Sequence, residues 1–261
     1  MNSHATSPRG TGPEPRPFAG ARPATGGTAR RTLLRTALTG AAALGTGLGA
    51  TGAATAAPAD PGTSPPRPGT PDEALRELAA GNRRWRTYRE RHPHENPAIR
   101  RTLATSQHPF AVVLGCIDSR VPPELVFDQG LGDLMTVRTA GEVLDEAVLG
   151  SVAYGVLELG IPLVVVLGHQ SCGAVRAAVA AEQSGEHLPA HMQYLVDQIR
   201  PAIDHGQEGD ARIDATVSAN VRLVRSRLAA EPELDARIAT GRLAIVGARY
   251  ELTTQAVNRL A

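Results

Sequence analysis

Two unbroken apolar runs dominate the pattern of hydrophobic and polar positions along the chain. The first is Phe110–Ile117 and the second begins at Ile161, and both lead into polar and sulfur-bearing side chains. Apolar runs of this length are typical of strands that are buried on both faces of a parallel sheet. Open α/β sheets bind ligands in the crevice at the carboxyl ends of their strands. We therefore expect the chemistry of this protein where these two strands end.

Helical patterns alternate with the predicted strands. Helices are expected at residues 97–105, 122–127, 145–159 and 173–183, a mostly helical region at 188–240, and strands at 134–138, 163–167 and 243–250, the last being the final strand. Such alternation is typical of a parallel sheet with helices on both faces. The expected fold class is α/β: a central, mostly parallel sheet flanked by helices, with an amino-terminal helical arm.

The arm begins at a clear helix-start signal. Residues 70–73 (Thr-Pro-Asp-Glu) form a capping box with proline at the first helical position, which predicts a helix from Thr70 to about Arg89. Leu75, Leu78 and Trp85 form a narrow apolar stripe on this otherwise arginine-rich helix. Because such a stripe needs to be buried, we expect it to pack on a second subunit.

The residues ahead of this helix have a different composition. Residues 1–28 are rich in Pro, Gly, Thr and Arg without periodicity, which predicts disorder. The pair Arg30-Arg31, a weakly apolar stretch to about Gly52 and Ala54-Thr55-Ala56 together indicate a signal peptide of the twin-arginine type. The apolar stretch is too short and too glycine-rich to predict a membrane span.

The predicted organisation has three parts. Residues 1–56 are the disordered amino terminus and signal peptide, residues 57–69 a proline-rich linker, and residues 70–261 the catalytic domain. The protein is therefore expected to be exported, to the extracellular side or the periplasmic or cell-wall side, without stable membrane insertion.

Composition excludes several classes of function. The formal net charge of +1 argues against a nucleic-acid partner, and 3% aromatic residues argue against a base-stacking surface. All 27 basic residues are arginine, which excludes chemistry that needs a lysine, such as Schiff bases.

The candidate site lies at the ends of the two apolar runs. Cys116, Asp118 and Arg120 alternate, so in an extended strand their side chains share one face. His169 and Cys172 are three residues apart, a spacing that a tight turn folds onto one centre. Two thiolates with one imidazole select zinc, and three ligands with one open position are the catalytic arrangement. A disulfide between the two cysteines is the alternative for an exported protein.

Three motifs make the chain from Thr70 to its end resemble the β-class carbonic anhydrases. They are Cys116-Ile117-Asp118-Ser119-Arg120-Val121-Pro122, Arg138-Thr139-Ala140-Gly141 and Gly168-His169-Gln170-Ser171-Cys172-Gly173. Many members of the class have Asn at the positions of Thr139 and Glu142. The resemblance implies reversible hydration of carbon dioxide to bicarbonate and a homodimer or tetramer, in which the amino-terminal helices embrace the partner subunit.

The resemblance also implies roles for individual residues. One zinc ion per subunit would be held by Cys116, His169 and Cys172, and Asp118 and Arg120 would be the catalytic pair, with Asp118 able to occupy the fourth zinc position. Zinc lowers the pKa of bound water from about 15.7 toward about 7 and so supplies a hydroxide nucleophile. Asp118 would orient that hydroxide, and Arg120 would hold Asp118 in its ionised form.

Two other functions fit part of this pattern. A hydrolase of carbon disulfide or carbonyl sulfide would use the same scaffold and zinc site. A non-catalytic exported zinc-binding protein, or a thiol-redox protein, would need the cysteines but not Asp118 and Arg120. The presence of that pair therefore favours an enzyme.

Overall fold

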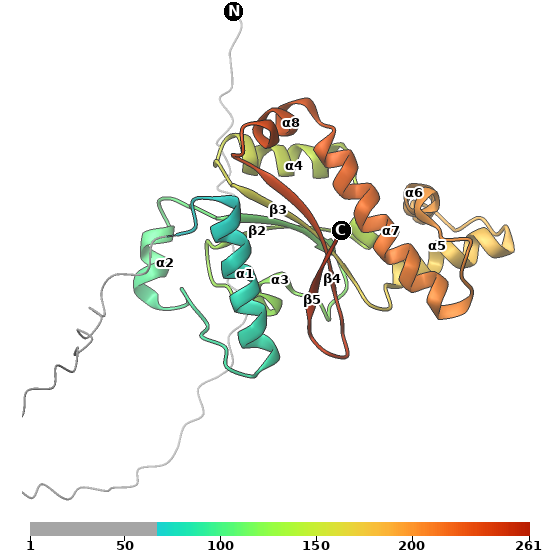
Figure 1. The fold of residues 1–261 in the computed structure, drawn as a ribbon, viewed down its shortest axis with the longest axis horizontal. Helices are drawn as coiled ribbons and strands as arrows, with labels where there is room; N and C mark the ends of the chain where they lie inside the picture. Colours follow the sequence, from blue (N-terminus) through green and yellow to red (C-terminus); the bar gives the residue numbers. More distant parts are fainter. Residues whose placement is uncertain (1–66) are drawn as a thin grey trace, which may run out of the picture. The chain divides into compact units, whose positions relative to one another are not determined.

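A five-stranded sheet forms the centre of the computed structural model, which describes residues 67–261 (Figure 1). The strand order is β2-β1-β3-β4-β5, and β1 to β4 are parallel while β5 runs antiparallel to β4. The strands are β1 (Ala111–Cys116), β2 (Leu134–Thr139), β3 (Leu163–His169), β4 (Ala244–Tyr250) and β5 (Val257–Leu260). The expected α/β fold with a mostly parallel sheet is confirmed. The predicted disordered segment, signal peptide and most of the linker lie outside the described residues.

The prediction that residues 243–250 form the last strand is wrong, because β5 follows them. A tight turn in which the Gln255 N–H donates to the Glu251 carbonyl at 2.7 Å reverses the chain. The next bond, from the Glu251 N–H to the Ala256 carbonyl at 2.8 Å, starts the antiparallel ladder. Two of the four β5 residues are polar and exposed, so the segment lacks the apolar run that marks the buried strands.

Three of the helices begin at residues whose side chains cap them. Thr70 forms the predicted capping box with Glu73, and the side chains of Asn96 and Asp145 each accept bonds from the first turn of the helix that follows. The helical elements are α1 (Pro71–Arg86), α2 (Pro97–Leu103), α3 (Pro123–Val126), η1 (Ala140–Glu142), α4 (Glu146–Leu157), α5 (Gly173–Ser184), α6 (Met192–Ile199), η2 (Arg200–Ala202), α7 (Gly209–Ala229) and α8 (Pro232–Ala239).

Alternate residues of each strand serve two different cores. Ala111 and Val113 of β1 pack with α1 and α3, whereas Val112 and Leu114 pack with α4, α7 and α8 on the other face (Figure 1). Both faces of the central strands are covered, which explains the unbroken apolar runs in the sequence. A third apolar cluster, from α5, α6 and α7, lies at the ends of β1 and β3 and includes both cysteines. Across residues 67–261, no helix is long and apolar enough to cross a membrane.

Helix α1 packs on the sheet of its own chain. Leu78 is 3% exposed within the core shared with β1, β3 and β4, and the Trp85 indole N–H donates to the Tyr250 hydroxyl at 3.0 Å. Asn82 bonds the end of α3 and the start of β5 through its amide. Leu75 and Trp85 stay only partly buried by these contacts, so the expected packing of the stripe on a second subunit stays a prediction.

Candidate metal centre

Three buried side chains meet at the carboxyl ends of two neighbouring strands. Cys116 is the last residue of β1, His169 is the last residue of β3, and Cys172 is the N-cap of α5. Their ligand atoms all lie within 4.8 Å of one another. Because β1 and β3 pair directly in parallel, with Gly115 opposite Leu167, their ends lie side by side. The structure thus brings together the three residues that the sequence predicts as ligands.

The short turn after β3 returns Cys172 to His169. Ser171 adopts a left-handed backbone conformation with φ of +55°, and the Gln170 N–H donates to the carbonyl of Tyr250 at 2.8 Å. Helix α5 then starts immediately at Gly173. This hydrogen bond holds the turn against β4, so the sheet as well as helix α5 determines the position of Cys172.

The two sulfur atoms lie within hydrogen-bond distance and are not joined in a disulfide. They are 3.9 Å apart, far beyond the roughly 2.05 Å of a disulfide, and both cysteines are free. The hydrogen bond from Cys172 lowers the pKa of Cys116 to about 4, and the same bond raises the pKa of Cys172. The Gly141 N–H also donates to the Cys116 sulfur at 3.4 Å. The alternative of a disulfide between the two cysteines is therefore wrong. The two sulfur atoms can instead bind a cation, and binding would release the proton that the pair holds.

His169 presents one ring nitrogen to the sulfur pair. Its Nδ1–H donates to the backbone carbonyl of Gln170 at 2.9 Å, which leaves Nε2 as the acceptor. This Nε2 is completely buried and has no hydrogen-bond partner within the described region. An orphaned buried acceptor beside two soft sulfur donors fits a zinc ligand set, with the Gln170 carbonyl fixing the tautomer.

Asp118 and Arg120 form the predicted ion pair, although the two residues do not lie on an extended strand. The Arg120 guanidinium donates to both carboxylate oxygens of Asp118, at 2.9 and 2.7 Å, and its backbone N–H donates at 2.9 Å. These bonds lower the pKa of Asp118 to about 2. Since β1 ends at Cys116, the two residues lie in a loop and do not share a strand face. Asp118 Oδ2 nevertheless lies 3.9 Å from His169 Nε2.

Arg138 holds the loop that carries Asp118, and sequence reasoning assigned it no role. Its guanidinium donates to the carbonyl of Cys116 at 2.8 Å and to that of Asp118 at 2.7 Å. Arg138 lies on β2 opposite Gly115 of β1, so the sheet register delivers it to this place. Only the pairing of the two strands could have indicated the contact.

An apolar pocket of about 420 Å³ adjoins the metal centre. Asp118 is the one charged residue among those that line it, and most of its wall comes from α5, α6 and the residues before α6. The lining residues are Cys116, Ile117, Asp118, Ala140, Gly173, Ala174, Ala177, Leu188, Met192, Leu195 and Val196. Such a pocket suits a small molecule without charge.

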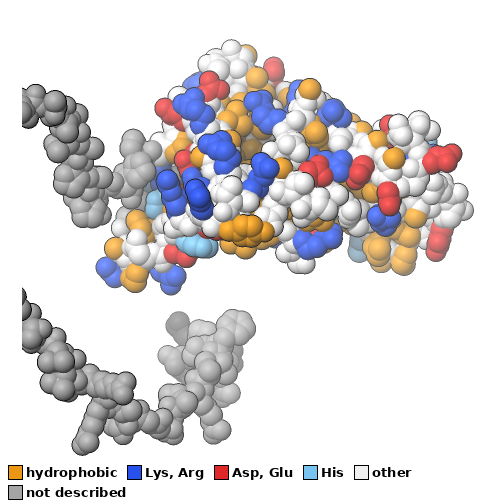
Figure 2. Space-filling model, turned by 60° about the horizontal axis from the view of Figure 1, so that its bottom comes forward, with side chains coloured by type: hydrophobic (Ala, Val, Ile, Leu, Met, Phe, Trp, Pro, Cys, Tyr) orange, Lys and Arg blue, Asp and Glu red, His pale blue; other side chains and the backbone are white. Residues whose placement is uncertain are grey.

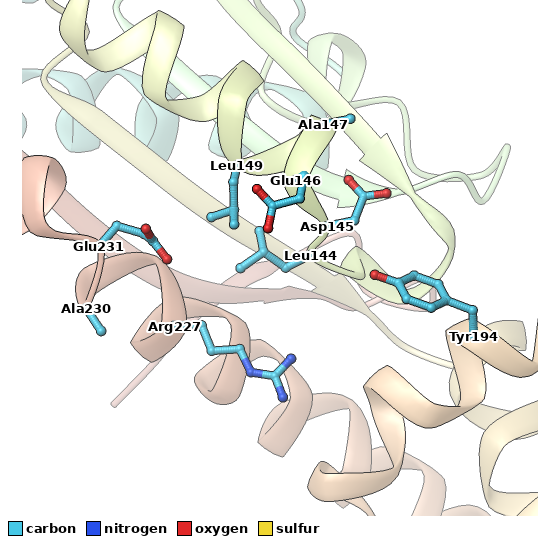
Figure 3. A pocket seen from close by; sticks show the side chains of 9 residues that line it. All are labelled: Leu144, Asp145, Glu146, Ala147, Leu149, Tyr194, Arg227, Ala230 and Glu231. Atoms are coloured by element: carbon cyan, nitrogen blue, oxygen red, sulfur yellow. The ribbon is translucent and has the colours of Figure 1, made fainter.

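Two other hollows contain neither cysteine nor histidine. One, of about 690 Å³, lies where α4 begins and is lined by Arg227 and by the acidic residues Asp145, Glu146 and Glu231 (Figure 3). A groove of about 370 Å³ lies between α1 and the sheet, and apolar residues and arginines line it. Figure 2 shows arginine and hydrophobic side chains on one face of the molecule. The buried Cys-His-Cys group lies at the pocket beside Cys116, so that pocket is the candidate active site.

A parallel α/β sheet with a Cys-His-Cys donor set at its strand ends has the ligands of a metal-binding protein. The family model described as carbonic anhydrase matches residues 111–257, which include every residue of the site. Carbonic anhydrase 2 of Mycobacterium tuberculosis is 45% identical over 184 residues, covering 70% of this chain and 89% of the relative. A carbonic anhydrase of Mycolicibacterium smegmatis is 42% identical with the same coverage.

The solved structures agree with this relationship. A Coccomyxa β-carbonic anhydrase in complex with acetazolamide matches with a TM-score of 0.59 and 26% identity, covering 71% of this chain and 86% of that chain. The chain therefore belongs to the carbonic anhydrase family, in its β class, and is an enzyme of that family.

Proposed function

We propose that this enzyme catalyses the reversible hydration of carbon dioxide to bicarbonate and a proton, with one zinc ion per subunit held by Cys116, His169 and Cys172. The observation that carries the proposal is the orphaned Nε2 of His169, which lies beside a sulfur pair at an apolar pocket. Membership of the carbonic anhydrase family supports the same reaction.

Zinc, when bound, would act as a Lewis acid that makes a water molecule acidic enough to serve as a nucleophile near neutral pH. The chain supplies the ligands in suitable form. Cys116 already has the character of a thiolate, and the Gln170 carbonyl keeps the proton of His169 on Nδ1. Both features favour metal binding at neutral pH.

Asp118 would orient the reacting water. Because Arg120 keeps its carboxylate ionised, Asp118 can only accept a hydrogen bond, and it would accept one from the reacting water. That bond would turn the oxygen lone pair toward the pocket. Arg138 would keep Asp118 in place through the two carbonyls that it binds.

The alternative in which Asp118 takes the fourth metal position is part of the same proposal. Here its carboxylate is engaged by Arg120 and not by the donor set, which is the arrangement that leaves room for water. The carboxylate already lies near the ring of His169, so release from Arg120 would allow it to reach the metal. Turnover would then stop, because the position of the reacting water would be taken.

The pocket would select the substrate by polarity. Its walls offer apolar contacts to neutral, linear carbon dioxide, whereas the bicarbonate product is charged and leaves toward water. Carbonyl sulfide and carbon disulfide are also linear and apolar, so a hydrolase of these molecules is the second candidate. A non-catalytic zinc-binding role gives no function to the Asp118–Arg120 pair.

A direct test uses zinc-loaded protein and two substrates. We expect stopped-flow measurements to show carbon dioxide hydration that acetazolamide inhibits, with negligible release of hydrogen sulfide from carbonyl sulfide. Sulfide release without carbon dioxide hydration would favour the second candidate. Stoichiometric zinc with neither activity would favour the non-catalytic role.

We further propose that the chain is exported through a twin-arginine-type signal within residues 1–56, and that residues 57–69 link it to the catalytic domain at 70–261. The capping box at Thr70 supports the domain boundary, because the first helix starts there. We also propose a homodimer or tetramer, which light scattering of the purified protein would test.

A further inference from the structure

The turn at residues 169–172, here called the ligand turn, carries two of the three proposed metal ligands, and Gln170 lies between them. The backbone carbonyl of Gln170 accepts the Nδ1–H of His169 at 2.9 Å, and its N–H donates to the carbonyl of Tyr250 at 2.8 Å. The next residue, Ser171, has a left-handed backbone with φ of +55°, which costs a non-glycine residue free energy. Contacts with the rest of the chain therefore have to hold this backbone in place.

The side chain of Gln170 makes one such contact. It reaches the turn at residues 251–256 between β4 and β5, here called the hairpin turn. Its Oε1 accepts a hydrogen bond from the Thr253 N–H at 3.2 Å and another from the Thr253 hydroxyl at 3.3 Å. The proposed reaction does not use this contact, and the sheet ladder does not include it. The two bonds join the ligand turn to a segment that is distant in sequence.

The hairpin turn is itself held in place by helix α1. Asn82 of α1 is buried, and its amide donates to the carbonyl of Gln255 at 2.9 Å. The side-chain oxygen of Asn82 also accepts the N–H of Val257, the first residue of β5, at 3.0 Å. A second element thus fixes the turn that presents Thr253. The hairpin turn can therefore act as an anchor for the side chain of Gln170.

We propose that Gln170 is a positioning residue of the metal centre, whose side chain, anchored by Thr253, keeps its own carbonyl directed at the ring of His169. Nε2 of that ring then stays directed at the two sulfur atoms. The inference rests on the proposed zinc site. A partner that holds the second ring nitrogen of a metal-bound histidine is worth about 10- to 100-fold in metal affinity. The role requires a hydrogen-bond acceptor at Oε1 and no charge.

Four variants separate this role from a general loss of stability. Gln170→Met keeps the length of the side chain and removes the acceptor. Thr253→Val removes one of the two donors, whereas Thr253→Ser is the conservative variant that keeps both. Gln198→Met is the matched control, because Gln198 of α6 is also a half-buried glutamine whose Oε1 accepts a hydrogen bond, in this case from Arg227 at 3.2 Å.

The readouts are zinc affinity, by competition with a chromophoric chelator, and the absorption spectrum of the cobalt(II)-loaded protein, which reports the geometry of the ligands. We expect Gln170→Met to lose about tenfold in zinc affinity and to shift the cobalt(II) bands. Thr253→Val should lose less, while Thr253→Ser and Gln198→Met should stay within about twofold of the wild type. An unchanged affinity and spectrum in Gln170→Met, or an equal loss in Gln198→Met, would overturn the inference.

A double-mutant cycle tests whether the two residues act through one contact. Once Gln170 lacks its acceptor, Thr253→Val should cost no further zinc affinity. The same loss from Thr253→Val in both backgrounds would overturn the inference. If Gln170→Met does not fold, the comparison of Thr253→Val with Thr253→Ser decides, because Thr253 is exposed. Equal affinities in these two variants would then overturn the inference.

The same measurements distinguish this inference from the proposed function, because both readouts report metal binding and not turnover. A zinc-loaded wild type without carbon dioxide hydration would refute the proposed reaction, and the affinities of the variants would still decide the role of Gln170. A wild type that binds no zinc would overturn the proposed site and this inference together.

Discussion

Arg120 determines the state of a single carboxylate at the pocket. Its hydrogen bonds lower the pKa of Asp118 to about 2, below the ordinary value of 3.8. The stabilisation from this pair is therefore complete above about pH 4 and is lost as the pH falls through about 2. Between pH 5 and 9 Asp118 stays ionised, so a change in activity within that range must come from the coupled site and not from protonation of Asp118.

This gives a prediction for the pH–rate profile. Wild-type hydration should rise with pH through one apparent pKa, whereas Arg120→Ala should lower the rate strongly at every pH from 6 to 9, because it frees Asp118 to bind the metal. Stopped-flow rates across this range, with zinc content measured in parallel, would check it. A profile for Arg120→Ala that matched the wild type in height would show that the pair has no role.

The site residues that the sequence predicted and those that it missed differ in their position relative to the apolar runs. Cys116, His169 and Cys172 directly end or follow apolar runs, so their meeting point follows from the parallel sheet. Arg138 contacts the site from another strand, and the strand register brings it there. A linear pattern does not contain that contact, and the residue gained a role only when the fold was known.

At the scale of elements, caps and apolar runs predicted most boundaries to within a few residues. The helix at Thr70 and the strand that ends near Cys116 are examples, because a capping box and a buried run are local signals. Strand β5 has no such signal and depends on its partner β4 and on the turn at 251–256. The packing of α1 on its own sheet likewise depends on contacts far apart in sequence.

The contact between α7 and β3 is close enough to test by substitution. A Cβ atom on Gly168 would lie 2.5 Å from the Val221 side chain, so Gly168→Ala should cost about 1–3 kcal/mol of unfolding free energy through overpacking. Gly150→Ala is the control, since no atom lies within 4 Å of its Cβ position in α4. Denaturant unfolding of both variants would check this, and equal stabilities would show that the contact can relax freely.

At the scale of the whole molecule, export and metal binding make a joint prediction. If the proposed twin-arginine route is used, the protein crosses the membrane folded, and its mature form should begin near Ala57 with zinc already bound. Both thiols would then be protected as ligands. Mass spectrometry of the exported form should find zinc and no disulfide. A Cys116–Cys172 disulfide without zinc would refute this order of events.

The account of the whole enzyme depends on an open metal position beside an oriented carboxylate. The most direct test is the rate of carbon dioxide hydration for the wild type and Asp118→Asn, with zinc content measured in the same samples. The account predicts one zinc per subunit in both proteins, because Cys116, His169 and Cys172 remain, and a rate lower by about 100-fold or more in the variant. Equal rates would remove Asp118 from the mechanism, and loss of zinc in the variant would make Asp118 a permanent ligand and contradict the open site.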